Sequence, residues 1–320
     1  MVRRTWQAMV MALLLLLTMC VSDGMCAALQ TVRVLATTYP VYLLTRVVAK
    51  ACPSLRVELL IPAQTGCPHE YALTPVDVRK LAEADIVVLN GLGLEAFMEK
   101  TLTEINHATI IDSSSCVAVL RETATHADSE SERHASAAGE THGGHGHGHA
   151  VNPHAFTSPL QAAAMVRVIG EGLARAVPEA AACRAEAEAC AARLETLAKR
   201  LQAIGNRSVY KDVILLHDGM AYLVRDAGLR LMDIIQEDED VQPSAARLLQ
   251  LAQRIRQHGS VLIMGEAQYH DKPVRTLAAE TGAAVVVLDS LASGPAEPPT
   301  AYYEQVMENN CRILEQYVGN

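Results

Sequence analysis

Short β-branched runs alternate with helical segments in this chain, and the alternation occurs in two separate blocks. The runs of the first block cover residues 32–36, 57–61, 86–89 and 109–111. Those of the second block cover residues 213–216, 229–235, 261–264 and 284–288. Strands that alternate with helices form parallel sheets covered by helices on both faces. The sequence therefore predicts an α/β fold with two βα lobes, each built on a parallel sheet.

A long helical segment separates the two blocks. Residues 179–204 are rich in Ala, Glu, Arg and Leu, which favour helix formation, and Pro178 precedes them. A helix of about 26 residues is roughly 39 Å long, so we interpret it as a rigid connector that belongs to neither core. The predicted division is an N-terminal lobe over 29–177, a connecting helix over 178–205 and a C-terminal lobe over 206–320.

The N-terminal residues 1–28 have the pattern of a signal peptide. Arg3 and Arg4 precede an apolar stretch over 8–17, and small residues follow it. The stretch is too short to span a bilayer comfortably, so we expect export to the periplasm and cleavage. Lipid attachment at Cys20 is the alternative, but the bulky residue before it favours cleavage without lipid.

Six cysteines follow the predicted leader. An oxidising compartment allows disulfides among them, and a single sequence does not define the connectivity. They are Cys52, Cys67, Cys116, Cys183, Cys190 and Cys311.

Residues 113–151 form a segment of different composition. It is rich in Ser, Glu, Gly, Ala and His and has no apolar periodicity, so it cannot bury enough surface to order itself. We expect a mobile loop whose imidazoles collect metal ions for a nearby site; the alternative is a solvated linker without that role. The histidines concerned are His126, His134, His142, His145, His147 and His149.

A Pro-His unit occurs twice, at His69 and at His154, and a Thr-Pro or Ser-Pro pair follows each. Such a pair suits the N-cap and first position of a helix, and Asp77 or Gln161 lies where a capping box requires it. We therefore expect each histidine on a short loop at the start of a helix.

Two further polar residues, His217 and Asp289, directly follow predicted strands of the second block. Ligands of α/β sheets bind at the carboxyl ends of strands. Any one of these side chains, or His69 or His154, is more simply explained alone as structural. Their joint arrangement, two from each lobe, predicts one metal ion in the cleft between the lobes.

Several motifs of this chain occur in a known family. The motifs are HEYALTPVDVR (69–79), ADIVVLNGLGLE (84–95), NPH (152–154), HDGMAY (217–222), GEAQ (265–268) and LDSL (288–291). In this order they resemble the metal-specific solute-binding proteins of ABC transporters, most closely the zinc-uptake periplasmic binding proteins. The resemblance implies two lobes joined by a long rigid helix around one zinc or manganese ion. It also implies that His69, His154, His217 and Asp289 are the ligands.

The ligand chemistry favours zinc over manganese. Three imidazoles and one carboxylate suit tetrahedral zinc, whereas manganese prefers more oxygen ligands. Glu266 follows its strand as the ligands do and is expected to orient an imidazole. Cys67, two residues before His69, is a candidate soft donor near the cleft.

These features predict a binding protein rather than an enzyme. We expect it to capture Zn²⁺ outside the cytoplasm as a monomer and to deliver it to an ABC permease driven by an ATPase. The net charge of -9 argues against nucleic acid as a partner. The alternatives are a manganese- or iron-binding member of the same family, a zinc-dependent hydrolase with Glu266 as its base, and a metal-binding adhesin.

Overall fold

The computed structural model describes residues 31–66, 68, 71–121, 151–236 and 242–317. The predicted signal peptide, Cys67, His69 and the histidines of the His-rich tract lie outside these residues. Within the described part of the chain, no helix has both the length and the apolar character needed to cross a membrane.

Four parallel strands form the first sheet, in the order β2-β1-β3-β4. Val34 of β1 pairs with Val57 of β2 on one side and with Ile86 of β3 on the other. The strands are β1 (Val32–Ala36), β2 (Leu55–Leu59), β3 (Ile86–Leu89) and β4 (Thr109–Asp112).

The second sheet repeats this plan with the order β6-β5-β7-β8, again all parallel. Its strands are β5 (Asp212–Leu215), β6 (Arg230–Ile234), β7 (Val261–Glu266) and β8 (Ala284–Leu288). In each sheet the strand order changes direction next to the strand that comes first in the chain, between β1 and β3 and between β5 and β7. Ligands of α/β sheets bind at such switch points. The predicted α/β fold of two βα lobes is confirmed.

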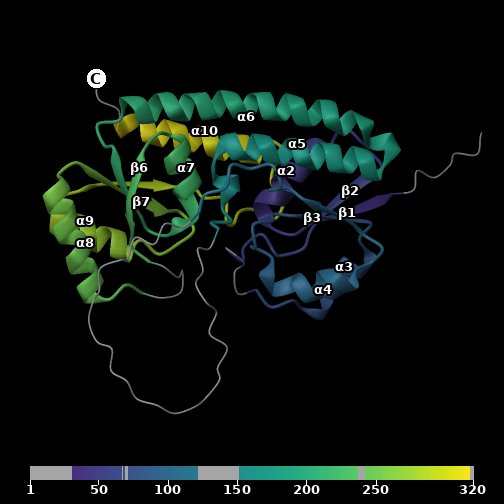
Figure 1. Ribbon diagram of the computed structural model, residues 1–320, viewed down its shortest axis with the longest axis horizontal. Coiled ribbons are helices and arrows are strands. Elements are labelled where there is room, and N and C mark those ends of the chain that lie inside the picture. The colour runs from purple at the N-terminus through teal and green to yellow at the C-terminus, as the bar shows by residue number, and fades with distance from the viewer. Residues whose placement is uncertain (1–30, 67, 69–70, 122–150, 237–241, 318–320) are drawn as a thin grey trace, which may run out of the picture.

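Helices cover both faces of each sheet (Figure 1). Those of the first half are α2 (Tyr39–Ala49), α3 (Pro75–Glu83), α4 (Glu99–Glu104) and α5 (Pro159–Ala176). Those of the second half are α7 (Ala221–Asp226), α8 (Ala245–His258), α9 (Lys272–Thr281) and α10 (Tyr302–Leu314).

The two Ser/Thr-Pro helix starts differ in their caps. Thr74 and Asp77 form the predicted capping box at the start of α3. Ser158 caps α5 by accepting the N–H of Leu160, but the box expected there is wrong. Gln161 instead accepts the N–H of Ala118 and donates to Asp226, because its amide is drawn into contacts with distant segments.

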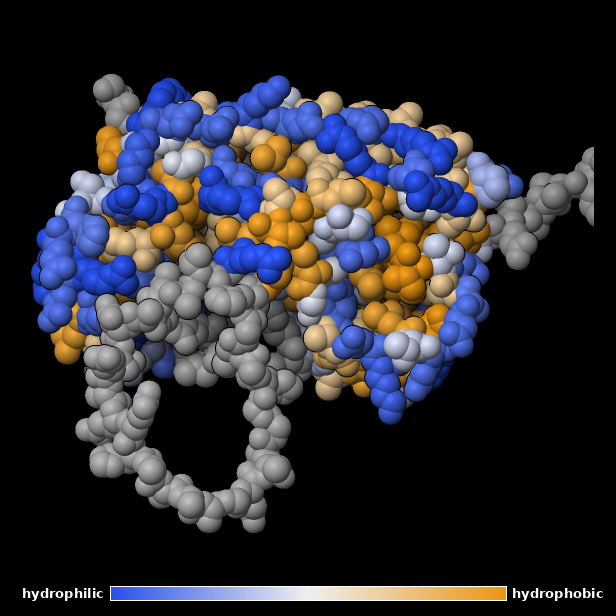
Figure 2. Space-filling view, viewed as in Figure 1, coloured by the Kyte–Doolittle hydropathy of each residue, from blue (hydrophilic) through white to orange (hydrophobic). Residues whose placement is uncertain are grey.

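The long helix α6 (Ala182–Arg207) runs across both lobes along one side of the molecule (Figure 1). It buries Cys183 and Leu194 in the apolar cluster of the first lobe, and Leu201 and Ile204 in that of the second. The predicted connector is confirmed, but the expectation that it belongs to neither core is wrong. Its outer edge carries hydrophilic residues in the same view (Figure 2).

Close helix packing fixes this connector at its end. A Cβ atom on Gly205 of α6 would lie 1.9 Å from the carbonyl oxygen of Ala227, just after α7. Only glycine allows the backbones to approach so closely. The second lobe is thereby held firmly against the end of α6.

The start of the predicted mobile loop is packed. Ser113 and Ser114 are buried, and both hydroxyls donate to the carbonyl of Asn90. Arg121 pairs with Val151 in an antiparallel bridge. The expectation of a loop that begins at residue 113 is therefore wrong for residues 113–121.

Among the described cysteines no disulfide is present. Four of these thiols are buried and one is exposed. They are Cys52, Cys183, Cys190 and Cys311, which are buried, and Cys116.

Candidate metal centre

His154 lies at the start of a short 3-10 helix, η2 (Ala155–Thr157), that leads into α5. The side-chain oxygen of Asn152 accepts the backbone N–H of His154 at 2.9 Å and lies 3.1 Å from the ring Nδ1. Thr157 donates its hydroxyl to the His154 carbonyl at 2.9 Å. His154 is only 3% exposed, so these bonds hold the ring inside the protein.

His217 stands two residues beyond the carboxyl end of β5 and is the N-cap of the 3-10 helix η4 (Asp218–Met220). Its Nδ1 accepts the backbone N–H of Gly219 at 3.2 Å. A backbone N–H only donates, so Nδ1 carries a lone pair in this contact. The ring is 6% exposed and points its other nitrogen, Nε2, towards Asp218.

The two imidazoles meet although they lie 63 positions apart in the chain (217 − 154). Their ring centres are 5.4 Å apart and their planes cross at 83°. Two imidazoles that share a tetrahedral zinc ion, with roughly 2.0–2.1 Å to each nitrogen, have ring centres about 5 Å apart. The pair therefore has the spacing that a shared ion requires.

Asp218 completes the cluster, and the sequence reasoning missed it. Its Oδ1 lies 3.1 Å from Nε2 of His217 and 3.5 Å from Nδ1 of His154. One donor atom from each of the three residues lies within 4.8 Å of the others. The only sequence signal was the position of Asp218 directly after a predicted ligand.

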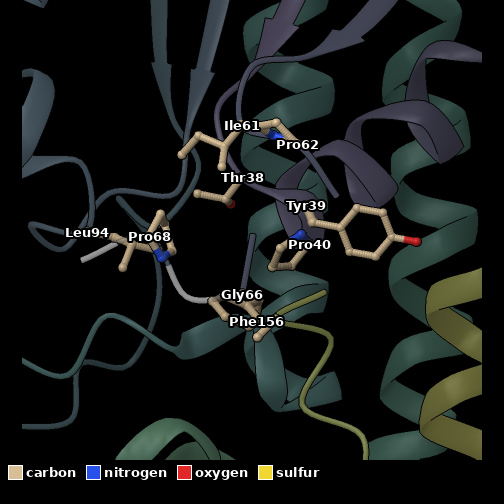
Figure 3. Close-up of a pocket in the computed structure, with 10 residues that line it drawn as sticks. Thr38, Tyr39, Pro40, Ile61, Pro62, Gly66, Pro68, Leu94 and Phe156 are labelled. Carbon is tan, nitrogen blue, oxygen red and sulfur yellow. The ribbon is translucent and has the colours of Figure 1, made fainter. Parts of the chain in front are cut away.

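A pocket with about 180 Å³ of empty space adjoins these residues. A second one, of about 310 Å³, shares Phe156 and Ala292 with it, so the two are neighbours. Figure 3 shows the second pocket, with Pro68 and Leu94 on one side and Tyr39 on the other. Pro68, which lines this pocket, directly precedes the predicted ligand His69. The first pocket is lined by His154, Phe156, Thr157, His217, Gly219, Glu266, Tyr269, Ser290 and Ala292.

Asp289 directly follows β8, as predicted, but the close cluster does not include it. Its Oδ1 accepts the amide of Gln268 at 2.5 Å and the N–H of Leu291 at 2.8 Å. Strands β5 and β8 are separated by β7, which puts their ends roughly 10 Å apart. Ser290, the residue after Asp289, lines the same pocket as His154 and His217.

Glu266 ends the strand β7 between them and is 3% exposed. A Cβ atom on Gly219 would lie 3.2 Å from Oε2 of Glu266 and 3.4 Å from Nδ1 of His217. Glu266 is thus close to the side of His217 that faces away from Asp218. Its expected role in orienting an imidazole remains a prediction, as does that of Cys67.

Contacts across the lobes fix one edge of the site. Ser158 and Gln161 at the start of α5 both donate to Oδ2 of Asp226 in α7, at 2.6 and 2.7 Å. The hydroxyl of Tyr222, also in α7, donates to the carbonyl of Asn152 at 2.9 Å. These contacts therefore hold His154 and His217 together across the two lobes.

Near Asp289 the environment keeps a tyrosine neutral. Burial raises the pKa of Tyr39, and the neighbouring Tyr302 and the negative charge of Asp289 raise it further. The neutral hydroxyl donates to the carbonyl of Pro295 at 3.0 Å. This bond ties α2 to the segment that follows β8.

Most of the chain matches one known protein family. Residues 34–317 match the family described as zinc-uptake complex component A, periplasmic (ZnuA). The zinc-binding lipoprotein AdcA of Streptococcus pneumoniae is 28% identical over 288 residues, which are 88% of this chain and 55% of that protein. This chain thus spans about half the length of AdcA.

Two further proteins match this chain over most of their own length. The high-affinity zinc uptake system protein ZnuA of Bacillus subtilis is 27% identical over 88% of this chain and 86% of its own. The structure of the solute-binding protein FpvC from Pseudomonas aeruginosa in complex with Mn²⁺ has a TM-score of 0.75 at 25% identity, covering 90% of this chain and 98% of that one.

Proposed function

Because this chain belongs to the family of periplasmic zinc-uptake complex component A proteins, we propose that it binds Zn²⁺ outside the cytoplasm and delivers it to an ABC-type importer. The action is binding and release rather than catalysis. The partner is a membrane permease with its ATPase, and the binding protein acts as a monomer.

One observation supports the proposal most strongly. The buried rings of His154 and His217, which are far apart in sequence, meet with the partly buried Asp218 in a cluster whose donor atoms lie within 4.8 Å of one another. The cluster borders a pocket at the carboxyl end of β5, where α/β sheets bind ligands. Imidazole nitrogens are donors that suit zinc.

The proposed ligands are His69, His154, His217 and Asp289. We assign Asp218 a different role: its Oδ2 accepts the amide of Asn152 at 2.8 Å, and its Oδ1 lies 3.5 Å from Nδ1 of His154 and 3.1 Å from Nε2 of His217. Asp218 then orients the rings, while Asp289 supplies the carboxylate of the bound state. Zinc binding needs neutral imidazoles, so protons compete with it as the pH falls.

Manganese is the second candidate ion, since the similar protein FpvC has a structure in complex with Mn²⁺. The relative AdcA is named as a zinc-binding lipoprotein, and the relative ZnuA as a high-affinity zinc uptake system protein. A donor set with three imidazoles has fewer oxygens than manganese prefers, which keeps zinc the first choice.

Two features outside the described residues complete the proposal. The signal peptide over residues 1–28 directs the chain to the periplasm. The six histidines between His126 and His149 collect zinc at low concentration and pass it towards His154.

Calorimetry with zinc and with manganese on the chain without residues 1–28 tests the proposed function. We expect one tight zinc site from which a tenfold excess of manganese does not displace zinc. The site must then prefer zinc by more than about 1.4 kcal/mol, the free energy that corresponds to a tenfold ratio. Transfer of the bound zinc into vesicles that contain the importer tests delivery. Equal binding of both ions would reject the zinc assignment, and absence of any tight site would reject the function.

A further inference from the structure

Asn152 is a buried amide with a complete set of partners at the edge of the metal centre. It is 2% exposed. Its Oδ1 accepts the backbone N–H of His154 at 2.9 Å, and its Nδ2 donates to Oδ2 and to the carbonyl oxygen of Asp218 at 2.8 and 3.1 Å. The Asn152 side chain therefore contacts both His154, a proposed ligand, and Asp218, which directly follows the proposed ligand His217.

These partners fix which end of the amide is oxygen. The backbone N–H of His154 can only donate, and the carbonyl of Asp218 can only accept. The opposite orientation of the amide would put donor against donor and acceptor against acceptor. The oxygen of Asn152 is therefore the atom that lies 3.1 Å from Nδ1 of His154.

The same reasoning fixes the proton on the imidazole of His154. Nδ1 faces the amide oxygen of Asn152 at 3.1 Å and Oδ1 of Asp218 at 3.5 Å, and both of these oxygens are acceptors. A neutral ring between two acceptors carries its proton on Nδ1. The lone pair is then on Nε2, the nitrogen available to a metal ion in this tautomer.

We propose that Asn152 is a positioning residue for zinc binding: it holds His154 in the tautomer and ring orientation that present Nε2 to the ion. The role as a metal-binding aid rests on the proposed function, because His154 must be a ligand. The tautomer does not, because the contacts that set it are made between protein groups alone. Outer partners of this kind fix the ring of a metal-binding histidine.

The backbone of Asn152 is itself held from two sides. Its N–H donates to the carbonyl of Leu120 at 3.0 Å, and its carbonyl accepts the hydroxyl of Tyr222 at 2.9 Å. The same hydroxyl accepts the N–H of Leu120 at 2.9 Å. Tyr222 comes from α7, so both lobes contribute to the position of the amide.

Three variants separate this role from ordinary packing. Asn152→Leu keeps the approximate volume but removes both the acceptor and the donor. Asn152→Asp keeps an acceptor oxygen for His154 and loses the donor to Asp218. Asn90→Leu is the matched control, since Asn90 is equally buried and donates to the carbonyl of Pro153 at 2.9 Å without touching the ring.

The experiment is long-range ¹H–¹⁵N NMR of the histidine rings in the metal-free chain in which a short turn replaces residues 122–150, with the His154 signal assigned by its loss in His154→Gln. We expect an Nδ1–H ring in wild type, in Asn152→Asp and in Asn90→Leu, and a shift towards Nε2–H in Asn152→Leu. Zinc titration of the same proteins should show a dissociation constant raised about 10- to 100-fold by Asn152→Leu, as for other outer partners.

The outcomes distinguish the two proposals. If Asn152→Leu keeps the Nδ1–H ring and the wild-type zinc affinity, or if Asn90→Leu changes both as much, the assignment to Asn152 is wrong. If wild type shows the Nδ1–H ring but binds no zinc, the tautomer assignment stands and the proposed function fails.

Discussion

His154 and His217 have ring centres 5.4 Å apart, although one precedes a helix that packs on the first sheet and the other follows the first strand of the second sheet. Asp218 lies between Nδ1 of His154 and Nε2 of His217. The centre thus joins the two lobes through two buried imidazoles and a partly buried carboxylate. Its consequences can be measured one at a time.

Removal of either histidine should abolish tight zinc binding. His154→Ala or His217→Ala deletes one imidazole donor, and we expect a loss above the 10- to 100-fold range of outer partners, thus more than about 100-fold. Zinc titration against a competing chelator measures it. His258→Ala is the control, because His258 is exposed on α8. A loss as large in the control would mean that the titration does not report this site.

The two carboxylates should differ in their effect on zinc. Asp289→Asn removes the proposed ligand oxygen and should weaken binding by more than about 100-fold, beyond the effect of an outer partner. Asp218→Asn keeps a side-chain oxygen beside the rings and should weaken it about 10- to 100-fold. Competition titrations of both variants give the order. The reverse order would make Asp218 the ligand and remove Asp289 from the set.

Deletion of the His-rich segment should leave the centre intact. Arg121 and Val151 pair at its base, and the N–H of Asn152 donates to Leu120 beside them. A short turn that replaces residues 122–150 therefore keeps the stem closed. Calorimetry should show fewer weakly bound ions and an unchanged tight site. Loss of the tight site would show that the segment supplies a ligand.

The capping box of α3 predicts a pH-dependent contribution to stability. Burial disfavours the Asp77 carboxylate, but hydrogen bonds from the hydroxyl and N–H of Thr74 and from the hydroxyl of Tyr71 outweigh it and lower the pKa of Asp77. A lowered folded-state pKa stabilises the fold above the unfolded value near 4, and this stability is lost as the pH falls through the folded value.

Asp77→Asn should therefore lower the free energy of unfolding at pH 7 by about 1 kcal/mol, the usual size of a lost cap. The difference from wild type should shrink as the pH falls below about 4, because the unfolded chain then takes up the proton before the folded one does. Urea unfolding at pH 7 and pH 3 measures both. A difference that is constant with pH would mean that the carboxylate charge contributes nothing.

The periodic features of the sequence were sufficient to predict the two sheets. Strands such as β1 and β8 have the predicted bounds, because β-branched runs between helical segments have few other solutions. The place of α6 was predicted less well. Its buried positions, including Cys183, Leu194 and Leu201, follow helical spacing, yet they lie in two different cores, and this depends on packing.

The site divides in a similar way. His154 and His217 were identified from local motifs, and the fold brings them together. Asp218 and Asn152 were not predicted as site residues, because their contacts at the site include residues far away in the chain. Gln161 was read as a cap for the same reason, since its amide binds Asp226 instead.

Anomalous diffraction at the zinc edge, from crystals of the zinc-loaded chain in which a short turn replaces residues 122–150, tests the central claim most directly. We expect one strong peak in the cleft, within about 2.0–2.2 Å of Nε2 of His154, of an imidazole nitrogen of His217 and of a carboxylate oxygen. A peak that has neither His154 nor His217 among its ligands would contradict the account.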